Sequence, residues 1–151
     1  MSKQSLVTEA TLAAAASGAA SDVVDEAAAA AFGVNRTDLR IIGLVAAAET
    51  LTAGELATRA RLSPAATTTA IQRLTHAGHL TRRTATEDRR RAVVELTQAA
   101  ARLLEEIYAP IERAGRAILE DYSAEQLELV VEVLRRGAEM QLGEAERIRG
   151  L

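Results

Sequence analysis

The sequence predicts a mainly α-helical protein that carries one small β-hairpin in its middle. The chain has 151 residues, of which 48% are apolar but only 2% aromatic, so Ala, Leu, Val and Ile must build its core. Such a composition favours helices. Helix-start patterns recur along the chain, and the hydrophobic period changes from 3.6 to 2 only between residues 80 and 96. One compact domain suffices at this length.

Composition also excludes several classes of protein. The chain has no apolar run of the roughly 18 residues needed to span a bilayer, and its start lacks the layout of a secretion signal. We therefore expect a cytoplasmic protein without membrane attachment. The absence of Cys excludes disulfides, thiolate metal sites and cysteine-based redox sensing. No phosphate-binding Gly-rich loop or nucleophile elbow is present, so neither enzymatic activity nor a cofactor is expected.

The Ala-rich N-terminal segment predicts a first helix over residues 6–32. Ser17 and Gly18 mark a candidate break, and Gly33 is a candidate stop. Because the segment has low complexity and few large apolar side chains, a disordered or frayed start is the alternative.

Two further helix starts are expected between residues 35 and 55. Asn35 can cap a helix that runs from Arg36 to about Ala48. Thr52 and Glu55 have the spacing of a capping box, in which each side chain bonds to the backbone N–H of the other residue. A short helix should follow this box.

The next pattern predicts the second helix of a helix-turn-helix. Ser63 is a good N-cap, Pro64 is tolerated at the first helical position, and Gly78 supplies a left-handed stop. Four residues fall on one face and are expected in the core: Thr67, Ala70, Ile71 and Leu74. Two helices joined by a tight turn, the second with small and polar residues outside, are typical of this motif.

A β-hairpin is predicted after the helix-turn-helix. Residues 80–84 and 91–96 are short β-tolerant runs, and in the second run Ala92, Val94 and Leu96 alternate with Arg91, Val93 and Glu95. The tip, residues 85–90, is polar and dense in charge, as expected for a wing that touches a phosphate backbone.

Two long helices should complete the chain. Thr97 can cap a helix that continues toward Asp121, with a kink or a change of helix at Pro110. Ser123 and Gln126 form another capping box at the start of the last helix. The apolar stripe of this helix is expected to contain Leu127, Val130, Val131, Leu134 and Ala138.

Charge is distributed unevenly along the chain. The net charge of −3 divides into −3 for residues 1–34, +4 for residues 35–97 and −4 for residues 98–151. Eight Arg against two acids leave +6 in the densest part. The eight are Arg59, Arg61, Arg73, Arg82, Arg83, Arg89, Arg90 and Arg91. Concentrated positive charge is the electrostatic footprint of a nucleic-acid-binding surface.

These segments, in this order, resemble the MarR family of winged helix-turn-helix transcriptional regulators. Residues 51–57 resemble the start of the family's first motif helix, and residues 63–74 with Gly78 resemble its recognition helix. Residues 88–97 match best, because they follow the family's acidic-x-Arg wing signature into a strand and a Leu-Thr helix start. The resemblance covers roughly residues 33–140, and the Ala-rich first helix departs from the family's bulkier one.

The resemblance implies a homodimer whose terminal helices interlock. Residues 1–34 would form an N-terminal dimerisation helix, residues 35–97 the winged helix-turn-helix that binds DNA, and residues 98–151 C-terminal dimerisation helices. Such a dimer would act as a sequence-specific regulator, a repressor by expectation, on double-stranded DNA with an inverted-repeat operator. A small-molecule effector is left open, as are its identity and the target genes.

The predicted DNA-binding residues fall into two groups. On the recognition helix, Thr68, Thr69, Gln72 and Arg73 are expected to reach base edges, while Ala65 and Ala66 offer methyl contacts to thymine. Ser63, Pro64 and Arg83 complete the set outside the wing tip. In the wing, the resemblance assigns minor-groove insertion to Arg90 with Asp88 as its support. Arg89 and Arg91 are then expected to contact phosphates.

Three alternatives remain beside this hypothesis. A winged-helix module that binds protein instead of DNA is one, although the charge pattern disfavours it. A metal-sensing repressor of the ArsR kind is another, disfavoured because Cys is absent and His76 and His79 are the only histidines. We interpret both histidines as solvent-exposed or phosphate-contacting and expect no metal site. An enzyme is the third and has no supporting motif.

Overall fold

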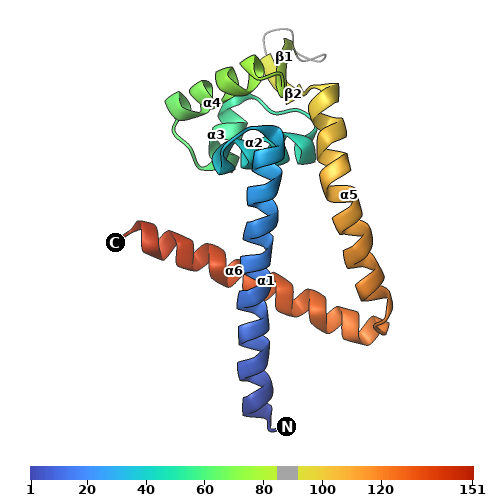
Figure 1. The fold of residues 1–151 in the computed structure, drawn as a ribbon. Helices are drawn as coiled ribbons and strands as arrows, with labels where there is room; N and C mark the ends of the chain where they lie inside the picture. Colours follow the sequence, from blue (N-terminus) through green and yellow to red (C-terminus); the bar gives the residue numbers. More distant parts are fainter. Residues whose placement is uncertain (85–91) are drawn as a thin grey trace. The chain divides into compact units, whose positions relative to one another are not determined.

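The computed structural model describes residues 1–84 and 92–151 of the chain. It divides into two compact units, Met1–Ile107 and Tyr108–Leu151. The elements in chain order are α1 (Lys3–Phe32), α2 (Arg36–Ala48), α3 (Ala53–Ala60), α4 (Pro64–His76), β1 (Leu80–Thr84), β2 (Ala92–Leu96), α5 (Gln98–Glu120) and α6 (Ala124–Arg149) (Figure 1). The predicted fold class, mainly helical with one hairpin, is confirmed.

Helix α1 is longer and more regular than its sequence predicts. It begins at Lys3 because the Ser2 hydroxyl accepts a hydrogen bond from the Ser5 N–H at 3.1 Å. It passes through Gly18 without a break, so the predicted interruption is wrong. One Gly costs a helix only about 1 kcal/mol relative to Ala, too little to end a segment this rich in Ala. The predicted stop at Gly33 is confirmed by its left-handed φ of 68°.

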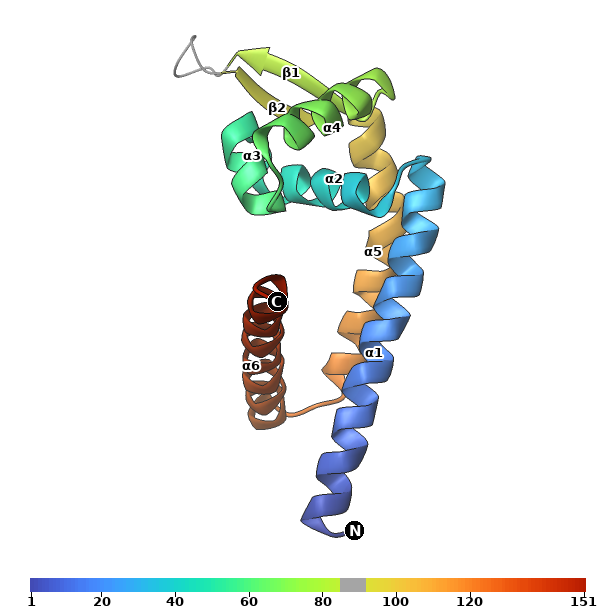
Figure 2. The same ribbon diagram turned by 90° about the vertical axis from the view of Figure 1, so that its left-hand side faces the viewer.

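Helices α2, α3 and α4 pack together and hold most of the core (Figure 2). The four residues predicted to form the inner face of α4 are all buried, and Ile71 and Leu74 are fully so. The N-caps predicted at Asn35 and Ser63 and the capping box of Thr52 with Glu55 are all present. These local signals therefore position the two motif helices as the sequence predicts.

The hairpin pairs β1 with β2 in antiparallel fashion, with Arg83 opposite Val93. Leu51 joins the sheet as well, because its N–H donates to the Val94 carbonyl at 3.1 Å. The predicted alternation in β2 is wrong, since Val93 and Val94 are both buried whereas Ala92 is exposed. Arg83 lies opposite Val93 and pairs with Glu95, which lies two residues further along the same face of β2.

A junction below the hairpin ties three helix ends together. The Thr97 hydroxyl donates to the Gly78 carbonyl at 2.7 Å and accepts from the Ala100 N–H at 3.2 Å, which starts α5. The Thr97 N–H donates to the His79 carbonyl at 3.0 Å. The His79 Nε2 lies 2.9 Å from the Phe32 carbonyl at the end of α1.

His79 therefore differs from the sequence-based interpretation, which placed both histidines in solvent. Its ring packs edge-on against the Phe32 ring, with centroids 5.4 Å apart, and is half-buried. His76, at the end of α4, remains exposed. The ring and the backbone carbonyl of Phe32 explain the partial burial of His79. Phe32 is far from His79 in sequence.

The unit Tyr108–Leu151 contains the second part of α5 and the whole of α6. Of the kink or change of helix predicted at Pro110, the change of helix does not occur, because α5 runs through this residue. The capping box of Ser123 and Gln126 is confirmed. No residue of this unit is buried, although the structure describes all of it. Within the described residues, no helix is long and apolar enough to cross a membrane.

Candidate nucleic-acid interface

Helix α4 presents a polar outer face opposite its buried one. Four residues at helical spacing form the centre of this face: Ala65, Thr69, Gln72 and His76. Thr68 lies at one edge of the face, whereas Ala66 and Arg73 lie at the other. All seven residues are exposed. The predicted recognition residues thus share one surface, and His76 joins them although the sequence analysis assigned it no base contact.

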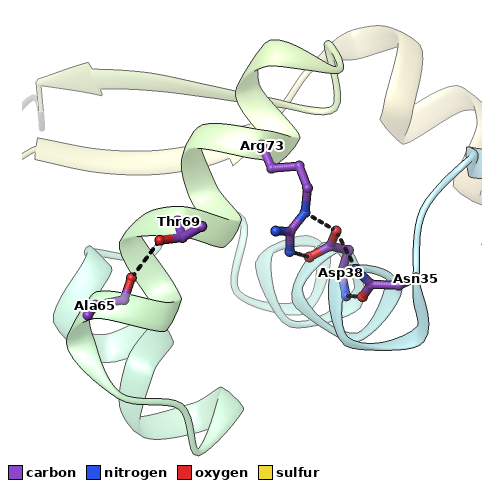
Figure 3. Close-up of polar contacts among 5 residues, drawn as sticks. All are labelled: Asn35, Asp38, Ala65, Thr69 and Arg73. Atoms are coloured by element: carbon purple, nitrogen blue, oxygen red, sulfur yellow. Dashed lines mark hydrogen bonds and ion pairs between the residues drawn. The ribbon is translucent and has the colours of Figure 1, made fainter.

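The side chains on this face differ in their hydrogen-bonding capacity. The Thr69 hydroxyl donates to the Ala65 carbonyl at 3.0 Å, so its proton is already used (Figure 3). The Gln72 amide and the Thr68 hydroxyl make no hydrogen bond to the part of the chain that the structure describes. Gln72 can therefore both donate to and accept from a base edge, as recognition of adenine requires.

The sequence predicts Arg73 as an unpaired residue that contacts bases. In the structure, Arg73 instead pairs with a residue of α2. Its Nε donates to Asp38 Oδ2 at 2.7 Å and its Nη2 to Asp38 Oδ1 at 2.6 Å (Figure 3). The hydrogen bond and the charge of Asp38 raise the pKa of Arg73 above its ordinary value. Asn35 Nδ2 also donates to the same carboxylate at 3.1 Å.

The described part of the wing places two arginines on opposite faces of β1. Arg83 pairs with Glu95 at 2.5 Å and remains nearly half exposed. Arg82, which the sequence analysis counted only in its charge sum, is exposed on the other face. The predicted contacts of Asp88, Arg89, Arg90 and Arg91 lie outside the described residues.

Open hollows flank α4 on both sides. One, of about 580 Å³, lies between α4 and the start of α2 and includes Arg36, Thr69 and Arg73 in its lining. The other, of about 470 Å³, lies between α3 and α4 and includes Arg61 and Thr68. A helix that stands between two hollows, with a polar ridge outward, has the shape needed to enter a groove.

A third hollow lies within Tyr108–Leu151. It measures about 600 Å³ and is lined by α5 and α6, with Leu119, Leu127 and Val131 forming its apolar wall and Arg116, Glu112 and Glu120 its charged side. Arg116 lies 3.9 Å from Glu112 across one helical turn. Among the described residues, no group of three or more His, Asp or Glu side chains is placed to hold a metal ion.

The helix-turn-helix, the hairpin and the polar ridge of α4 together define a winged helix-turn-helix protein. The family model described as "MarR family" matches residues 32–91. An uncharacterised HTH-type transcriptional regulator of Bacillus subtilis, YcgE, is 31% identical over 124 residues, which span 82% of this chain and 80% of that protein. The chain therefore belongs to the MarR family of transcriptional regulators.

Solved structures support the same fold. The YusO protein of Bacillus subtilis matches with a TM-score of 0.63 at 21% identity, covering 92% of this chain and 99% of that one. NadR, solved in complex with 4-hydroxyphenylacetate, matches with a TM-score of 0.58 at 27% identity, covering 79% of this chain and 86% of that one.

Proposed function

We propose that this regulator acts as a homodimer that binds an inverted-repeat operator and represses transcription. The observation that carries the proposal is the exposed polar ridge of α4 on a winged helix-turn-helix. In such motifs the N-terminal part of the recognition helix contacts base edges in the major groove. Thr68 and Thr69 lie in this part, Gln72 lies one turn further along the same face, and the wing, with Arg90, would reach the neighbouring minor groove.

Unpartnered apolar surface supports the dimer. Every residue from 1 to 23 is exposed, although α1 carries Leu6, Val7 and Leu12 there. Most helical stability in proteins comes from packing of an apolar face, so exposed apolar side chains along α1 are consistent with a partner there. A second copy of the chain supplies one.

Helix α6 strengthens this argument because it is apolar on two opposite faces. Leu127 and Val131, on the predicted stripe, line the hollow against α5. Leu129, Val133 and Met140 form a second stripe and are 59–67% exposed. A helix that is apolar on two sides is typically buried from both. The second stripe is available to a partner chain, and so is Leu134, which lies on the first stripe beyond the hollow and is 67% exposed.

Release by a small molecule is the finer part of the proposal. NadR is solved with a small aromatic acid bound. The apolar hollow between α5 and α6, with Arg116 at its side, offers this chain a site for a ligand of that kind. Thermal unfolding with and without 4-hydroxyphenylacetate, followed by operator binding at the same concentrations, tests this part by itself.

Selection of operators from a random DNA pool tests the proposal as a whole. We expect enriched sites with two-fold symmetry and half-site centres about 10 bp apart or a multiple of it. Binding should also weaken by roughly 10³ to 10⁵ between 50 and 200 mM salt if six to ten phosphates are contacted. No enrichment together with a nearly flat salt response would favour the rival function, a winged-helix module that binds protein.

A further inference from the structure

One buried carboxylate joins the start of α2 to the recognition helix. Asp38 is only 1% exposed, yet it lies within reach of solvent-facing Arg73. Asn35 holds this carboxylate from the other side, and the Asp38 N–H donates to Asn35 Oδ1 at 2.9 Å. The carboxylate is thereby fixed in position and orientation before any ligand binds.

The pairing occupies one edge of the Arg73 guanidinium and leaves another edge open. Nε and Nη2 donate to Asp38. One N–H of Nη1 and one of Nη2 form a second, parallel pair of donors. Figure 3 shows the remaining terminal nitrogen pointing away from Asp38, and half of the side chain is exposed.

The surroundings of Arg73 give room for a ligand. Arg73 lines the hollow of about 580 Å³ together with Ala66 and Thr69 of α4 and Thr37 of α2. This hollow adjoins the edge of the outward face of α4. DNA that docks on that face would bring its nearest acceptors to this edge.

We propose that Asp38 is a positioning residue that holds Arg73 for a bidentate contact with DNA. The inference rests on the proposed function. Two acceptors on DNA match the open edge: the N7 and O6 atoms of guanine, and two oxygens of a backbone phosphate. A guanidinium that is already fixed loses less side-chain entropy when either acceptor binds.

Stability alone is a poor explanation for this pair. A buried ion pair is often no more stabilising than apolar side chains of similar size, because desolvation of the charges offsets their attraction. Here the carboxylate is buried while its partner stays half exposed. That arrangement orients the arginine toward solvent instead of sealing it in the core.

Three variants and one matched control isolate the role of Asp38. Arg73→Ala removes the contact, and Arg73→Lys keeps a charge opposite Asp38 but loses the forked donors. Asp38→Asn keeps the shape of the side chain and removes its charge. Glu144→Gln is the control, because Glu144 pairs with Arg147 at 2.7 Å on α6 and neither residue lines the hollow beside Arg73. Thermal unfolding and oligomeric state are measured for each full-length protein.

Binding is then measured on the selected operator, on operators changed at one base pair at a time, and on random DNA. If guanine is the acceptor, a wild-type preference of about 5- to 150-fold at one G·C pair in each half-site falls in both Arg73 variants. Asp38→Asn loses part of the preference at that G·C pair and keeps the preferences at the other base pairs. If phosphate is the acceptor, the three variants weaken binding to operator and random DNA alike. Glu144→Gln leaves both unchanged.

Several results would overturn the inference. The Asp38→Asn variant could unfold at a lower temperature and still bind every DNA like the wild type. The Asp38–Arg73 pair would then only stabilise the fold. A new base preference in Asp38→Asn means that Asp38 keeps Arg73 away from DNA. Arg73→Lys that binds like the wild type excludes a forked contact even if Asp38→Asn does not fold. Absence of any sequence preference in the wild type contradicts the proposed function itself, and is seen before variants are compared.

Discussion

On the outer face of α4, neighbouring side chains are unequal candidates for base recognition. The Thr69 hydroxyl already donates a hydrogen bond to the Ala65 carbonyl, so it can only accept one from DNA. The Gln72 amide makes no hydrogen bond to residues 1–84 or 92–151, so it can both donate and accept, which matches the donor and acceptor that adenine presents in the major groove. His76 lies one turn further toward the end of α4, and recognition helices contact bases mainly with their N-terminal part. Gln72 is therefore the residue on which sequence preference should depend most.

Gln72→Ala should lower affinity for the operator by about 1–3 kcal/mol while changing binding to random DNA less, because a bidentate base contact is lost. The ratio of the two affinities, measured by competition, should shrink. Gln98→Ala is the matched control, since Gln98 is an exposed glutamine at the start of α5. An unchanged ratio in Gln72→Ala would remove this residue from base recognition.

The wing tip supports a second prediction at this scale, which rests on the family resemblance. Arg90→Ala should weaken binding most on operators with A·T-rich flanks, because a narrow minor groove attracts an inserted arginine. Arg89→Ala and Arg91→Ala should weaken operator and random DNA alike and lower the salt slope by about one unit per contact. Asp88→Ala should copy Arg90→Ala in part. If Arg90→Ala binds flank-substituted and random DNA as the wild type does, the assignment is wrong.

Among the elements, the ends of α1, α4 and α5 meet at one junction in the unit Met1–Ile107. Gly78 ends α4 with a φ of 81°, and Thr97 bonds to its carbonyl while capping α5. His79 connects the same point to the end of α1 through Phe32. The end of α1 and the start of α5, two helices proposed for dimerisation, are thus both hydrogen-bonded to the residues that follow α4.

Thr97→Val should lower the free energy of unfolding by about 0.5–2 kcal/mol, because it removes the hydroxyl that caps α5 and bonds to Gly78. Thr97→Ser, which keeps the hydroxyl, should lose much less. Denaturant unfolding at one fixed protomer concentration makes the comparison, since the stability of a dimer depends on concentration. Faster amide exchange in the first turn of α5 should accompany the Val variant. Equal stabilities of the two variants would show that the hydroxyl is dispensable.

For the whole molecule, the distribution of burial is the main constraint. All buried residues among those described lie between Ala28 and Ala100. The helices outside that span carry exposed large side chains, including Leu12, Ile118 and Leu134, each 63–67% exposed. On α6 three such side chains, Leu129, Val133 and Met140, share one face, and contiguous exposed apolar surface is typical of an interface. The folded state is therefore expected to be a dimer, with little stable monomer.

Leu134→Glu should yield monomer or aggregate, because it would place a charge without a partner in the proposed interface. Arg135→Gln changes the charge by the same amount at an exposed neighbouring site and should remain a dimer. Sedimentation of both proteins makes the comparison, and DNA binding should fail only in Leu134→Glu. A soluble Leu134→Glu dimer that binds DNA normally would place α6 outside the interface.

Local chemistry made much of this fold accessible from sequence. The caps of α2, α3, α4 and α6 depend on side chains within three residues of the backbone they satisfy, so a short window identifies them. The buried face of α4 follows from helical period alone. An error arose at Gly18, where the cost of one Gly is too small to end α1. At Pro110 the sequence left a kink and a change of helix open, and α5 continues through the residue.

Sequence alone determined four features of this protein: its composition, its helix starts, its hairpin and the polar face of α4. The last three depend on the local order of residues. Only the tertiary structure decided what distant residues do to one another. Arg73 and Asp38 are 35 positions apart, and His79 and Phe32 are 47 apart. Neither pairing follows from spacing, because it depends on how α4 packs against its neighbours. That packing changed Arg73 from a free base-contacting candidate into one held by a buried carboxylate, and it took His79 out of solvent.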